Sequence, residues 1–329
     1  MTRYISGIQP TGQPHLGNYF GAIKQHIELQ DKVDNPNDAL FFVADFHALT
    51  NGTLTRKELA NNTEEVITTY LALGLDLNKS RLFCQSSMGG IHPSVAFVLA
   101  CNIGSGVLMR QHAYQSKIEA GLVPNAGLLY YPILMAADIL LYDADIVPVG
   151  IDQKQHIELA RDIAQAFNSR YGETFKLPKA QFSETPRVIG TDGRKMSKSY
   201  NNTIPILDKP KKIKKIIMSI ETDSTDYTTT PLDPDECTVF QLYSLFSNEE
   251  ELVRMRDLYI NDRSFGYGHA KKMLFEKHQE SFGEAYKKQQ ELKNDQLYLS
   301  EILNPSSLAA YEICRLKEAK VLGTIGLRA

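Results

Sequence analysis

The chain lacks several features that identify whole classes of protein. It has no tryptophan, and its four cysteines, Cys84, Cys101, Cys237 and Cys314, stand far apart without a Cys-x-x-Cys pair. This spacing indicates neither a zinc site nor a disulfide framework. No apolar run approaches the roughly 20 residues of a membrane-spanning helix, and no signal peptide is recognisable. We therefore expect a cytoplasmic protein with no membrane partner.

The sequence also lacks a strong overall charge. Its 36 lysines and arginines nearly balance 39 acidic residues, for a formal net charge of -3. Any nucleic-acid partner would therefore have to contact a local basic patch. The 329 residues, of which 43% are hydrophobic, suffice for two globular domains or one large one.

The most unusual stretch that is present runs from Gly193 to Ser199, with the sequence Gly-Arg-Lys-Met-Ser-Lys-Ser. Such a density of charge cannot be buried, so the stretch predicts an exposed loop between the turn signals Asp192-Gly193 and Asn201-Asn202. Two lysines with serines around them suit a mobile cover for phosphate groups. The alternative is a solvated basic loop without a ligand.

A second loop, residues 9–18, separates an expected strand at 3–8 from a helical pattern that begins at Tyr19. A strand, a glycine-rich loop and a helix in this order place backbone N–H groups against an anion. His15 and Asn18 stand at the helix start and could donate to phosphate oxygens without a permanent charge. The Gly-Lys-Ser/Thr end of a P-loop is missing. The alternative is an ordinary loop histidine and an N-cap asparagine.

The following segments predict alternating strands and helices. Residues 39–45 form a continuous apolar run typical of a buried parallel strand, 55–73 read as a helix and 80–85 as a further strand. His47 and Gln85 come at or after strand ends, the edge where open α/β sheets bind ligands. His47 could instead be a loop histidine without a ligand. We expect a doubly wound parallel α/β sheet.

Residues 127–143 predict an apolar helix with Pro132 in its first turn. Tyr131, Met135, Asp138 and Tyr142 recur every three or four residues and so share one face. A carboxylate among apolar side chains is costly unless it meets a donor. This face therefore suits a flat apolar ligand with one N–H or O–H directed at Asp138. The alternative is an Asp138 that bonds a backbone N–H or a lysine.

Read together, these motifs resemble a known family. Pro-x-Gly-x-x-His-Leu-Gly-Asn at 10–18 and Lys-Met-Ser-Lys-Ser at 195–199 resemble the paired signatures of class I aminoacyl-tRNA synthetases, with Asn18 in place of a second histidine. The stretches 131–142 and 147–159 resemble the bacterial tryptophanyl-tRNA synthetases in particular. The resemblance extends over essentially the whole chain. It implies a Rossmann-like catalytic domain at 1–204, with a helix at 306–329 packing back on it, and an α-helical anticodon-recognition domain at 205–305.

The resemblance also implies roles for individual residues. The catalytic residues would be His15, Asn18, Lys195 and Lys198. The ATP-binding residues would be Gln9, Pro10, Thr11, Gly17, Asn18, Gly150, Ile151, Asp152, Val188, Lys195, Met196, Ser197, Lys198 and Ser199. The tryptophan-binding residues would be Tyr131, Met135, Asp138, Val147, Val149, Gln153 and His47, with Asp138 accepting the indole N–H. Mg²⁺ would enter with ATP, and no metal site on the protein itself is expected. Three features differ from the commoner bacterial pattern. Ile5 replaces a frequent aromatic residue, Lys117 or Gln115 would take the place of an ATP-binding lysine, and residues 191–194 form a shorter lead into Lys195.

The C-terminal third predicts helices at 237–247, 249–261, 266–293 and 295–303, then a break at Pro305 and a last helix at 306–322. The only dense basic run, Lys-Lys-Ile-Lys-Lys at 211–215, could contact a tRNA backbone, or it could be a solvated helix face. The resemblance further implies tRNA(Trp) as a partner and a homodimer.

The expected function is activation of L-tryptophan with ATP and its transfer to the 3′ end of tRNA(Trp). One alternative is a tyrosyl-tRNA synthetase, in which a phenol O–H would meet Asp138. Another is a catalytically silent tryptophan-binding regulator, which would have no need of both phosphate motifs. A nucleotidyltransferase shares the first motif but does not account for the helical C-terminal third.

Overall fold

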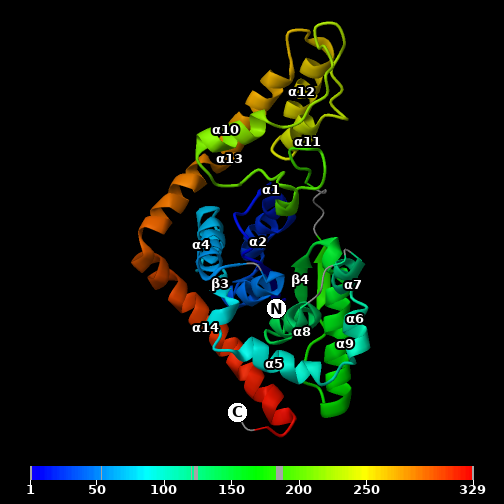
Figure 1. The fold of residues 1–329 in the computed structure, drawn as a ribbon. Helices are drawn as coiled ribbons and strands as arrows, with labels where there is room; N and C mark the ends of the chain where they lie inside the picture. The colour runs from blue at the N-terminus through cyan, green and yellow to red at the C-terminus, as the bar shows by residue number, and fades with distance from the viewer. Residues whose placement is uncertain (1, 53, 120, 122–124, 183–187, 328–329) are drawn as a thin grey trace. The chain divides into compact units, whose positions relative to one another are not determined.

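The structure is a computed structural model that describes residues 2–52, 54–119, 121, 125–182 and 188–327, without the side chains of Asn51, Ala113, Lys117 and Asp152. Over these residues, five parallel strands form one sheet in the order β3-β2-β1-β4-β5 (Figure 1). The strands are β1 (Tyr4–Ile8), β2 (Ala39–Val43), β3 (Arg81–Cys84), β4 (Ile146–Val149) and β5 (Lys179–Phe182). The doubly wound parallel sheet expected from the sequence is confirmed.

The helices alternate with these strands and then continue alone. Those between the first and last strands are α1 (Leu16–Asn18), α2 (Lys24–Leu29), α3 (Asp45–Ala48), α4 (Arg56–Ala72), α5 (Ile91–Ala100), α6 (Ser105–Met109), α7 (His112–Glu119), α8 (Ala126–Leu140) and α9 (Lys154–Tyr171). Those after the sheet are α10 (Pro210–Met218), α11 (Thr238–Ser244), α12 (Glu249–Asn261), α13 (Tyr267–Asn294) and α14 (Gln296–Thr324).

Packing divides the chain into two compact units. The sheet unit comprises Met1–Gln13, Gln25–Ser183 and Asp295–Ala329, and the helical unit comprises Pro14–Lys24 and Glu184–Asn294. This division by packing differs from the expected functional domains, because residues 14–24 and 188–204 pack with the helices. Both phosphate-type motifs, at 15–18 and 195–199, therefore lie in the helical unit.

Side chains that alternate along β2 explain why helices cover both faces of the sheet. Leu40 and Phe42 are buried in one core with apolar residues of α5, α8, α9 and α14. Phe41, between them, stacks on His26 of α2, whose Nδ1 pairs with the Tyr70 hydroxyl of α4 at 2.8 Å. Because successive side chains of a strand point to opposite faces, this apolar run requires two helical layers.

Two expectations about prolines were wrong. Pro305 does not separate two helices, because it lies inside α14. The helix continues through it because α14 packs along the edge strand β3, where Ser306 Oγ accepts the Leu82 N–H at 2.7 Å. Pro132 is not in the first turn of α8, because Asn125 caps that helix earlier by accepting the Leu128 N–H at 2.8 Å.

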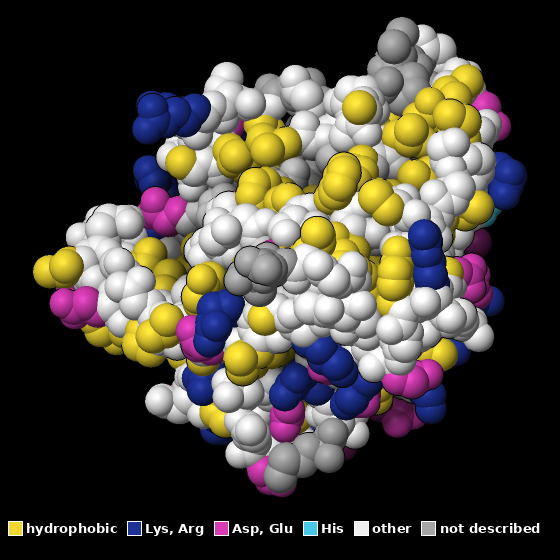
Figure 2. All heavy atoms as spheres, turned by 90° about the horizontal axis from the view of Figure 1, so that it is seen from below, with side chains coloured by type: hydrophobic (Ala, Val, Ile, Leu, Met, Phe, Trp, Pro, Cys, Tyr) yellow, Lys and Arg dark blue, Asp and Glu magenta, His cyan; other side chains and the backbone are white. Residues whose placement is uncertain are grey.

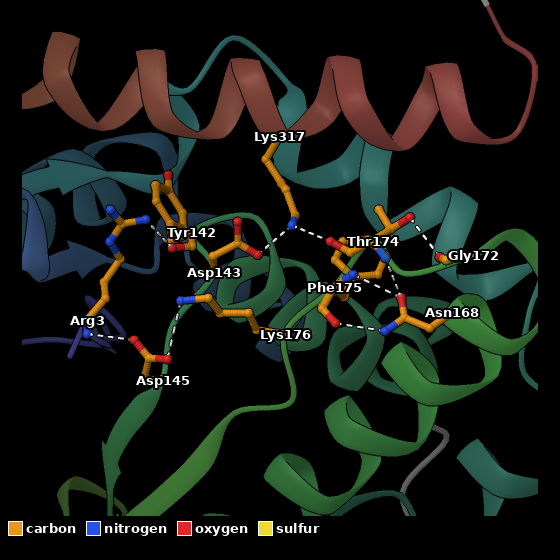
Figure 3. A network of polar contacts seen from close by, with 10 residues as sticks. All are labelled: Arg3, Tyr142, Asp143, Asp145, Asn168, Gly172, Thr174, Phe175, Lys176 and Lys317. Atoms are coloured by element: carbon orange, nitrogen blue, oxygen red, sulfur yellow. Dashed lines mark hydrogen bonds and ion pairs between the residues drawn. The ribbon is translucent and has the colours of Figure 1, made fainter. Parts of the chain in front are cut away.

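A polar network holds α14 against the ends of other elements in the sheet unit (Figure 3). The Lys317 ammonium is buried, donates to the Asp143 carboxylate and the Thr174 carbonyl, and lies 5.2 Å from the Phe175 ring centroid. Burial lowers the pKa of Lys317, and the charge of Asp143 opposes that shift. Lys317 therefore links the C-terminal helix α14 by an ion pair to Asp143, in the turn that directly follows α8.

We expect Lys317→Ala to lower the free energy of unfolding by about 2–4 kcal/mol, because it leaves a buried carbonyl without a donor and a carboxylate without its cation. Urea denaturation would measure the loss. Lys320→Ala is the matched control, since Lys320 lies on the same helix and is exposed. Equal losses for the two variants would contradict a specific role for the Lys317 network.

In the helical unit, α10 and α11 both pack on α13. Ile213 and Ile217 form the buried side of α10, while the lysines at 211, 212, 214 and 215 are exposed. The residues around α1 join this unit through aromatic contacts: the Tyr19 ring lies edge-on to Phe282, with centroids 4.9 Å apart. These contacts anchor the first phosphate motif among the helices.

The surface carries both charged and apolar side chains. Figure 2 shows hydrophobic side chains at several places on the face seen from below, with lysines, arginines and acidic residues among them. Exposed apolar side chains include Phe97 of α5 and Leu316 of α14, which are 67% and 62% exposed. Among the described helices, none combines the length and the apolar character needed to cross a bilayer.

Candidate functional site

The first group of candidate residues stands at one edge of the sheet. Because all the strands are parallel, the segments that follow β1, β2, β3 and β4 leave from the same, carboxyl-terminal edge. Gln9 follows β1, His47 lies in α3 after β2, Gln85 follows β3 and Gly150 follows β4. This edge is where an open α/β sheet binds its ligand.

Asp138 is the centre of this group. Its side chain is 1% exposed and accepts three hydrogen bonds. Oδ1 accepts from Gln85 Nε2 and His92 Nδ1, both at 2.6 Å, and Oδ2 accepts from His47 Nε2 at 2.7 Å. Among the described residues, the donors to Asp138 are thus two imidazoles and a carboxamide, rather than the backbone N–H or lysine of the alternative considered from the sequence.

These donors determine the state of the carboxyl group. Burial by itself would raise the pKa of Asp138, but the hydrogen bonds and charges of His47 and His92 lower it to about 2. Asp138 is therefore a carboxylate at neutral pH and can only accept hydrogen bonds. Two carboxylate oxygens offer about four acceptor positions. With two used on Oδ1 and one on Oδ2, one position on Oδ2 remains for a ligand donor.

His92 connects Asp138 to Tyr142. Its Nδ1–H donates to the carboxylate, and its Nε2 is hydrogen-bonded to the Tyr142 hydroxyl at 2.9 Å. Both side chains are fully buried, and burial raises the pKa of Tyr142 well above its usual value. Tyr142 lies just beyond the end of α8, so it reaches Asp138 through this histidine.

Sequence reasoning did not assign roles to His92 or to the Gln85 side chain. Gln85 carried a signal, because it follows a strand at the ligand edge, but His92 lies inside α5 and carried none. Gln85 is 0% exposed, and its Oε1 has no hydrogen-bond partner within the described part of the chain. A buried acceptor of this kind is costly unless a ligand or water satisfies it.

A second hydrogen-bonded chain joins two of the expected tryptophan-binding residues. Since the Gln153 Oε1 atom can only accept, His156 Nδ1–H donates to it at 2.9 Å. His156 Nε2 then accepts from the Tyr131 hydroxyl at 2.8 Å. Burial raises the pKa of Tyr131 to about 12, and its ring lies edge-on to His47 at 6.1 Å between centroids. His156 connects the pair but was not predicted.

Apolar residues of the group lie in the core beside these chains. Val147 is buried, and Met135 and Val149 are half-buried against the same hydrophobic cluster. Ile5 is fully buried there, so it contributes to the core of β1. Ile151 is 70% exposed in the turn that precedes α9. The side chains of Asp152 and Lys117 lie outside the described residues, so their predicted roles stay predictions.

The other candidate residues form a second group in the helical unit. A short antiparallel bridge joins His15 to Pro205, with Leu16 N–H donating to the Ile204 carbonyl at 2.9 Å. Gly17 belongs to the first motif and faces Met196 of the second. A Cβ atom at Gly17 would be 2.9 Å from His15 Nδ1 and 3.7 Å from Met196 Cβ, so glycine lets the motifs approach closely. We call residues 15–18 and 188–199 the phosphate cluster.

The donors of the phosphate cluster have unusual protonation properties. Burial and, secondarily, the charge of Lys198 lower the pKa of His15 to about 4, so its imidazole is neutral at neutral pH. His15 Nδ1 is buried and has no partner within the described residues. Burial lowers the pKa of Lys198 to about 8, while Lys195 is exposed. The cluster therefore combines one neutral imidazole with two lysines of different environments.

Asn18 has a capping role as well as any ligand role. Its Oδ1 accepts the His15 N–H at 3.1 Å, as the alternative considered from the sequence allowed. This bond uses the carboxamide oxygen and leaves Nδ2 as the donating side. The same bond positions the amide beside His15.

The second motif is a defined hairpin in this structure. Ile189 pairs with Lys195, Gly190 N–H donates to the Arg194 carbonyl at 2.7 Å and Met196 N–H donates to the Val188 carbonyl at 3.0 Å. Gly193 has φ +75°, a left-handed conformation that suits the predicted turn. The Ser197 hydroxyl accepts the Ser199 N–H at 3.3 Å.

The predicted residues therefore form two clusters, one in each unit. Gln9, Pro10, Thr11, Gly150 and Ile151 lie in the sheet unit with Asp138, and Gly17, Val188 and the motif at 195–199 lie in the helical unit. The sheet cluster offers a buried acceptor surrounded by apolar and aromatic groups. The helical cluster offers cations and neutral donors suited to phosphate oxygens.

Comparisons with known proteins agree with this chemistry. The chain matches the family described as tRNA synthetases class I (W and Y) over residues 1–283. It is 46% identical to a tryptophan–tRNA ligase of Fusobacterium nucleatum, over 99% of both chains. It is 45% identical to a tryptophan–tRNA ligase of Rhodopirellula baltica, over 99% of this chain and 100% of the relative.

A solved structure is similar over the same length. It is tryptophanyl-tRNA synthetase from Campylobacter jejuni complexed with ADP and tryptophan, with 41% identity and a TM-score of 0.91, covering 99% of this chain and 100% of the other.

Proposed function

Because the chain belongs to the class I tRNA synthetases of the tryptophan and tyrosine type, we propose that its two clusters divide the work of one reaction, with amino-acid selection in the sheet unit and ATP activation in the helical unit. The chain activates L-tryptophan with ATP to tryptophanyl-adenylate and pyrophosphate, and it transfers tryptophan to the 3′ end of its tRNA. The observation that carries the division of work is the buried Asp138 carboxylate with one acceptor position left.

Asp138 selects tryptophan by accepting the indole N–H on Oδ2. His47, His92 and Gln85 hold the carboxylate ionised and in place, and Met135, Val147 and Val149 supply apolar walls for the ring. An analogue without an N–H or O–H at this point would leave a buried acceptor unpaired. Sites built in this way reject such analogues by about 10⁴–10⁵-fold.

Tyr131 and Gln153 hold the α-amino group of tryptophan, with Gln9 and His47 nearby. The oxygens of Tyr131 and Gln153 each have acceptor capacity beyond their bond to His156, and an ammonium group can donate to them. His156 keeps the two oxygens in a defined arrangement. The His47 ring lies edge-on beside Tyr131, close to where the amino group would bind.

The phosphate cluster stabilises the charge that develops on ATP. The tryptophan carboxylate attacks the α-phosphorus, a new P–O bond forms, and the bond to pyrophosphate breaks, with the electron pair leaving on pyrophosphate. His15 and Asn18 donate to phosphate oxygens, while Lys195 and Lys198 supply positive charge. No side chain acts as a nucleophile, so the protein contributes position and electrostatics.

Mg²⁺ enters as part of the ATP substrate. In the phosphate cluster, the Asp192 carboxylate already accepts from Arg194 at 2.6 Å and from Asn202 at 2.6 Å. Mg²⁺ prefers oxygen ligands and commonly binds through substrate phosphates. The ATP phosphates therefore hold the ion.

The remaining residues that we expect to bind ATP belong to the sheet unit. The ribose and base meet Gly150, Ile151 and Asp152 in the turn before α9, and Gln9, Pro10 and Thr11 follow β1 at the same sheet edge. Residues 1–204 with 306–329 form the functional catalytic domain, and 205–305 form the domain that reads the anticodon.

The lysines at 211–215 contact the tRNA backbone, a role supported by their exposure on one side of α10. The enzyme works in the cytoplasm as a homodimer, in keeping with its family.

The experiment that tests this function is ATP–pyrophosphate exchange measured with tryptophan, tyrosine or phenylalanine. We expect exchange with tryptophan alone. Exchange with tyrosine would keep the fold and reject the assignment of Asp138 to an indole N–H. If no amino acid supports exchange, the absence of tryptophan from the chain lets bound L-tryptophan be followed by its own fluorescence, and binding alone would indicate a regulator.

A further inference from the structure

One buried carboxamide holds the hairpin of the phosphate cluster together. Asn202 is 2% exposed and lies just beyond the motif at 195–199. Its Oδ1 accepts the Ser197 N–H at 2.8 Å. Its Nδ2 donates to the Lys195 carbonyl at 3.1 Å and to Asp192 Oδ1 at 2.6 Å. The Asn202 side chain thus bonds to the loop at three points: Asp192, Lys195 and Ser197.

The backbone around Asn202 is built to receive this side chain. Its carbonyl accepts the Thr191 N–H at 3.0 Å, which joins the two ends of the hairpin. A Cβ atom at Gly190 would be 2.3 Å from both Cγ and Nδ2 of Asn202, a distance that real Cβ atoms essentially never show. Glycine at 190 therefore leaves the space that the carboxamide fills. The hairpin therefore packs closely around the Asn202 side chain.

The neighbouring Asn201 has a different role. Its side chain is exposed, and its φ of 52° is left-handed, a conformation that asparagine adopts more readily than most residues. Its main-chain N–H closes the short turn by donating to the Lys198 carbonyl at 3.1 Å. Asn201 therefore contributes its backbone conformation, whereas Asn202 contributes side-chain hydrogen bonds.

We propose that Asn202 is a positioning residue for adenylate formation: it sets the backbone from Lys195 to Ser197 so that Lys195 and Lys198 present their ammonium groups to the ATP phosphates. It acts through these residues and does not contact ATP. The proposal rests on the proposed function of the phosphate cluster. It assigns to Asn202 an effect on the chemical step, separate from tryptophan binding, which belongs to residues of the sheet unit.

The amide, rather than a carboxylate, is required by its neighbour. Nδ2 donates to Asp192, so an aspartate at 202 would place two carboxylates within hydrogen-bonding distance. Carboxylates at such a distance share a proton, and the pair then titrates well above the usual value for aspartate. Arg194, which donates to the other oxygen of Asp192, opposes this shift without supplying the missing donor.

The test compares Asn202→Ala, Asn202→Asp and the control Asn201→Gly in tryptophan-dependent ATP–pyrophosphate exchange. We expect Asn202→Ala to lower kcat by about 20–50-fold, in the range of a lost positioning contact. The dissociation constant for L-tryptophan, followed by its fluorescence, should stay within about twofold of the parent value. Asn201→Gly should exchange at close to the parent rate, because glycine adopts the left-handed conformation readily.

The pH dependence of Asn202→Asp separates positioning from general damage to the fold. At about pH 7.5 both carboxylates are ionised while Lys198 keeps most of its charge, and the variant should lose activity as alanine does, whereas at about pH 5 the shared proton restores the donor in part. We expect the ratio of parent to variant rates to shrink about fivefold or more between these conditions. This comparison follows the parent and Asn202→Asp at two pH values, so it tests the proposal even if Asn202→Ala folds poorly.

Three results would overturn the proposal while the parent enzyme is active with tryptophan. They are unchanged exchange in Asn202→Ala, an equal loss of tryptophan affinity and exchange, and a pH-independent penalty in Asn202→Asp. A parent protein that shows no tryptophan-dependent exchange would instead refute the proposed function, and this proposal with it.

Discussion

Replacing Lys195 with alanine is expected to lower tryptophan-dependent ATP–pyrophosphate exchange by about 10²–10³-fold, the usual effect of removing one preorganised charge or donor from a transition state. Lys195 is exposed in this structure, and its carbonyl, rather than its ammonium, bonds Asn202. The substitution therefore leaves the hairpin intact and removes only the charge.

Binding of L-tryptophan should be unchanged in Lys195→Ala, because the groups that contact it lie in the sheet unit. Fluorescence titration of the amino acid measures this separately from exchange. Lys209→Ala serves as the control, since it removes an exposed lysine of the same unit outside the motif. Exchange by Lys195→Ala at a rate comparable with the parent would remove Lys195 from the catalytic residues.

Asp138→Asn is expected to have the largest effect on the choice of amino acid. Asparagine keeps the shape of aspartate but replaces one oxygen by an NH₂ group. Since Gln85, His47 and His92 all donate to Asp138, that NH₂ group would face a donor whichever way the amide turns. We expect kcat/KM for tryptophan to fall about 10³-fold and discrimination against phenylalanine to fall about 10²-fold, because the site no longer offers a fixed acceptor.

The same substitution should also destabilise the sheet unit. Unpaired buried donors and the loss of a buried charge partner cost about 2–4 kcal/mol in the free energy of unfolding. Urea denaturation measures this cost, and exchange with tryptophan and phenylalanine measures the selection. Asp162→Asn is a suitable control, because Asp162 is an exposed aspartate of α9 in the same unit. If Asp138→Asn discriminated as the parent does, Asp138 would not read the indole N–H.

The strand patterns at 3–8, 39–45 and 80–85 were sufficient to predict a doubly wound parallel sheet, and the structure confirms it. Continuous apolar runs encode burial on both faces, which is a local property of the chain. Lys195, Lys198 and His15 could be singled out for a related reason: dense charge, glycine and turn residues are recognisable without tertiary contacts. The helical spacing likewise placed Tyr131 and Asp138 on one face.

Other features depended on contacts between distant segments. His92 and Gln85 bond Asp138 from α5 and from the end of β3, and His156 bonds Tyr131 from α9. No spacing in the sequence marks a buried histidine as the partner of a particular carboxylate.

Pro305 illustrates the same limit for a helix. By itself proline is a reason to end a helix, since it removes a backbone donor. The packing of α14 on β3 outweighed that preference.

The sequence by itself thus determined the sheet, the two phosphate motifs and the helical face that carries Asp138, because each follows from local periodicity or composition. Only the tertiary structure decided which side chains hold those groups in place: His92 and Gln85 around Asp138, and Asn202 within the hairpin. The reason is physical. A buried polar group must find a partner wherever the fold brings one within about 3 Å, and that partner can come from any part of the chain.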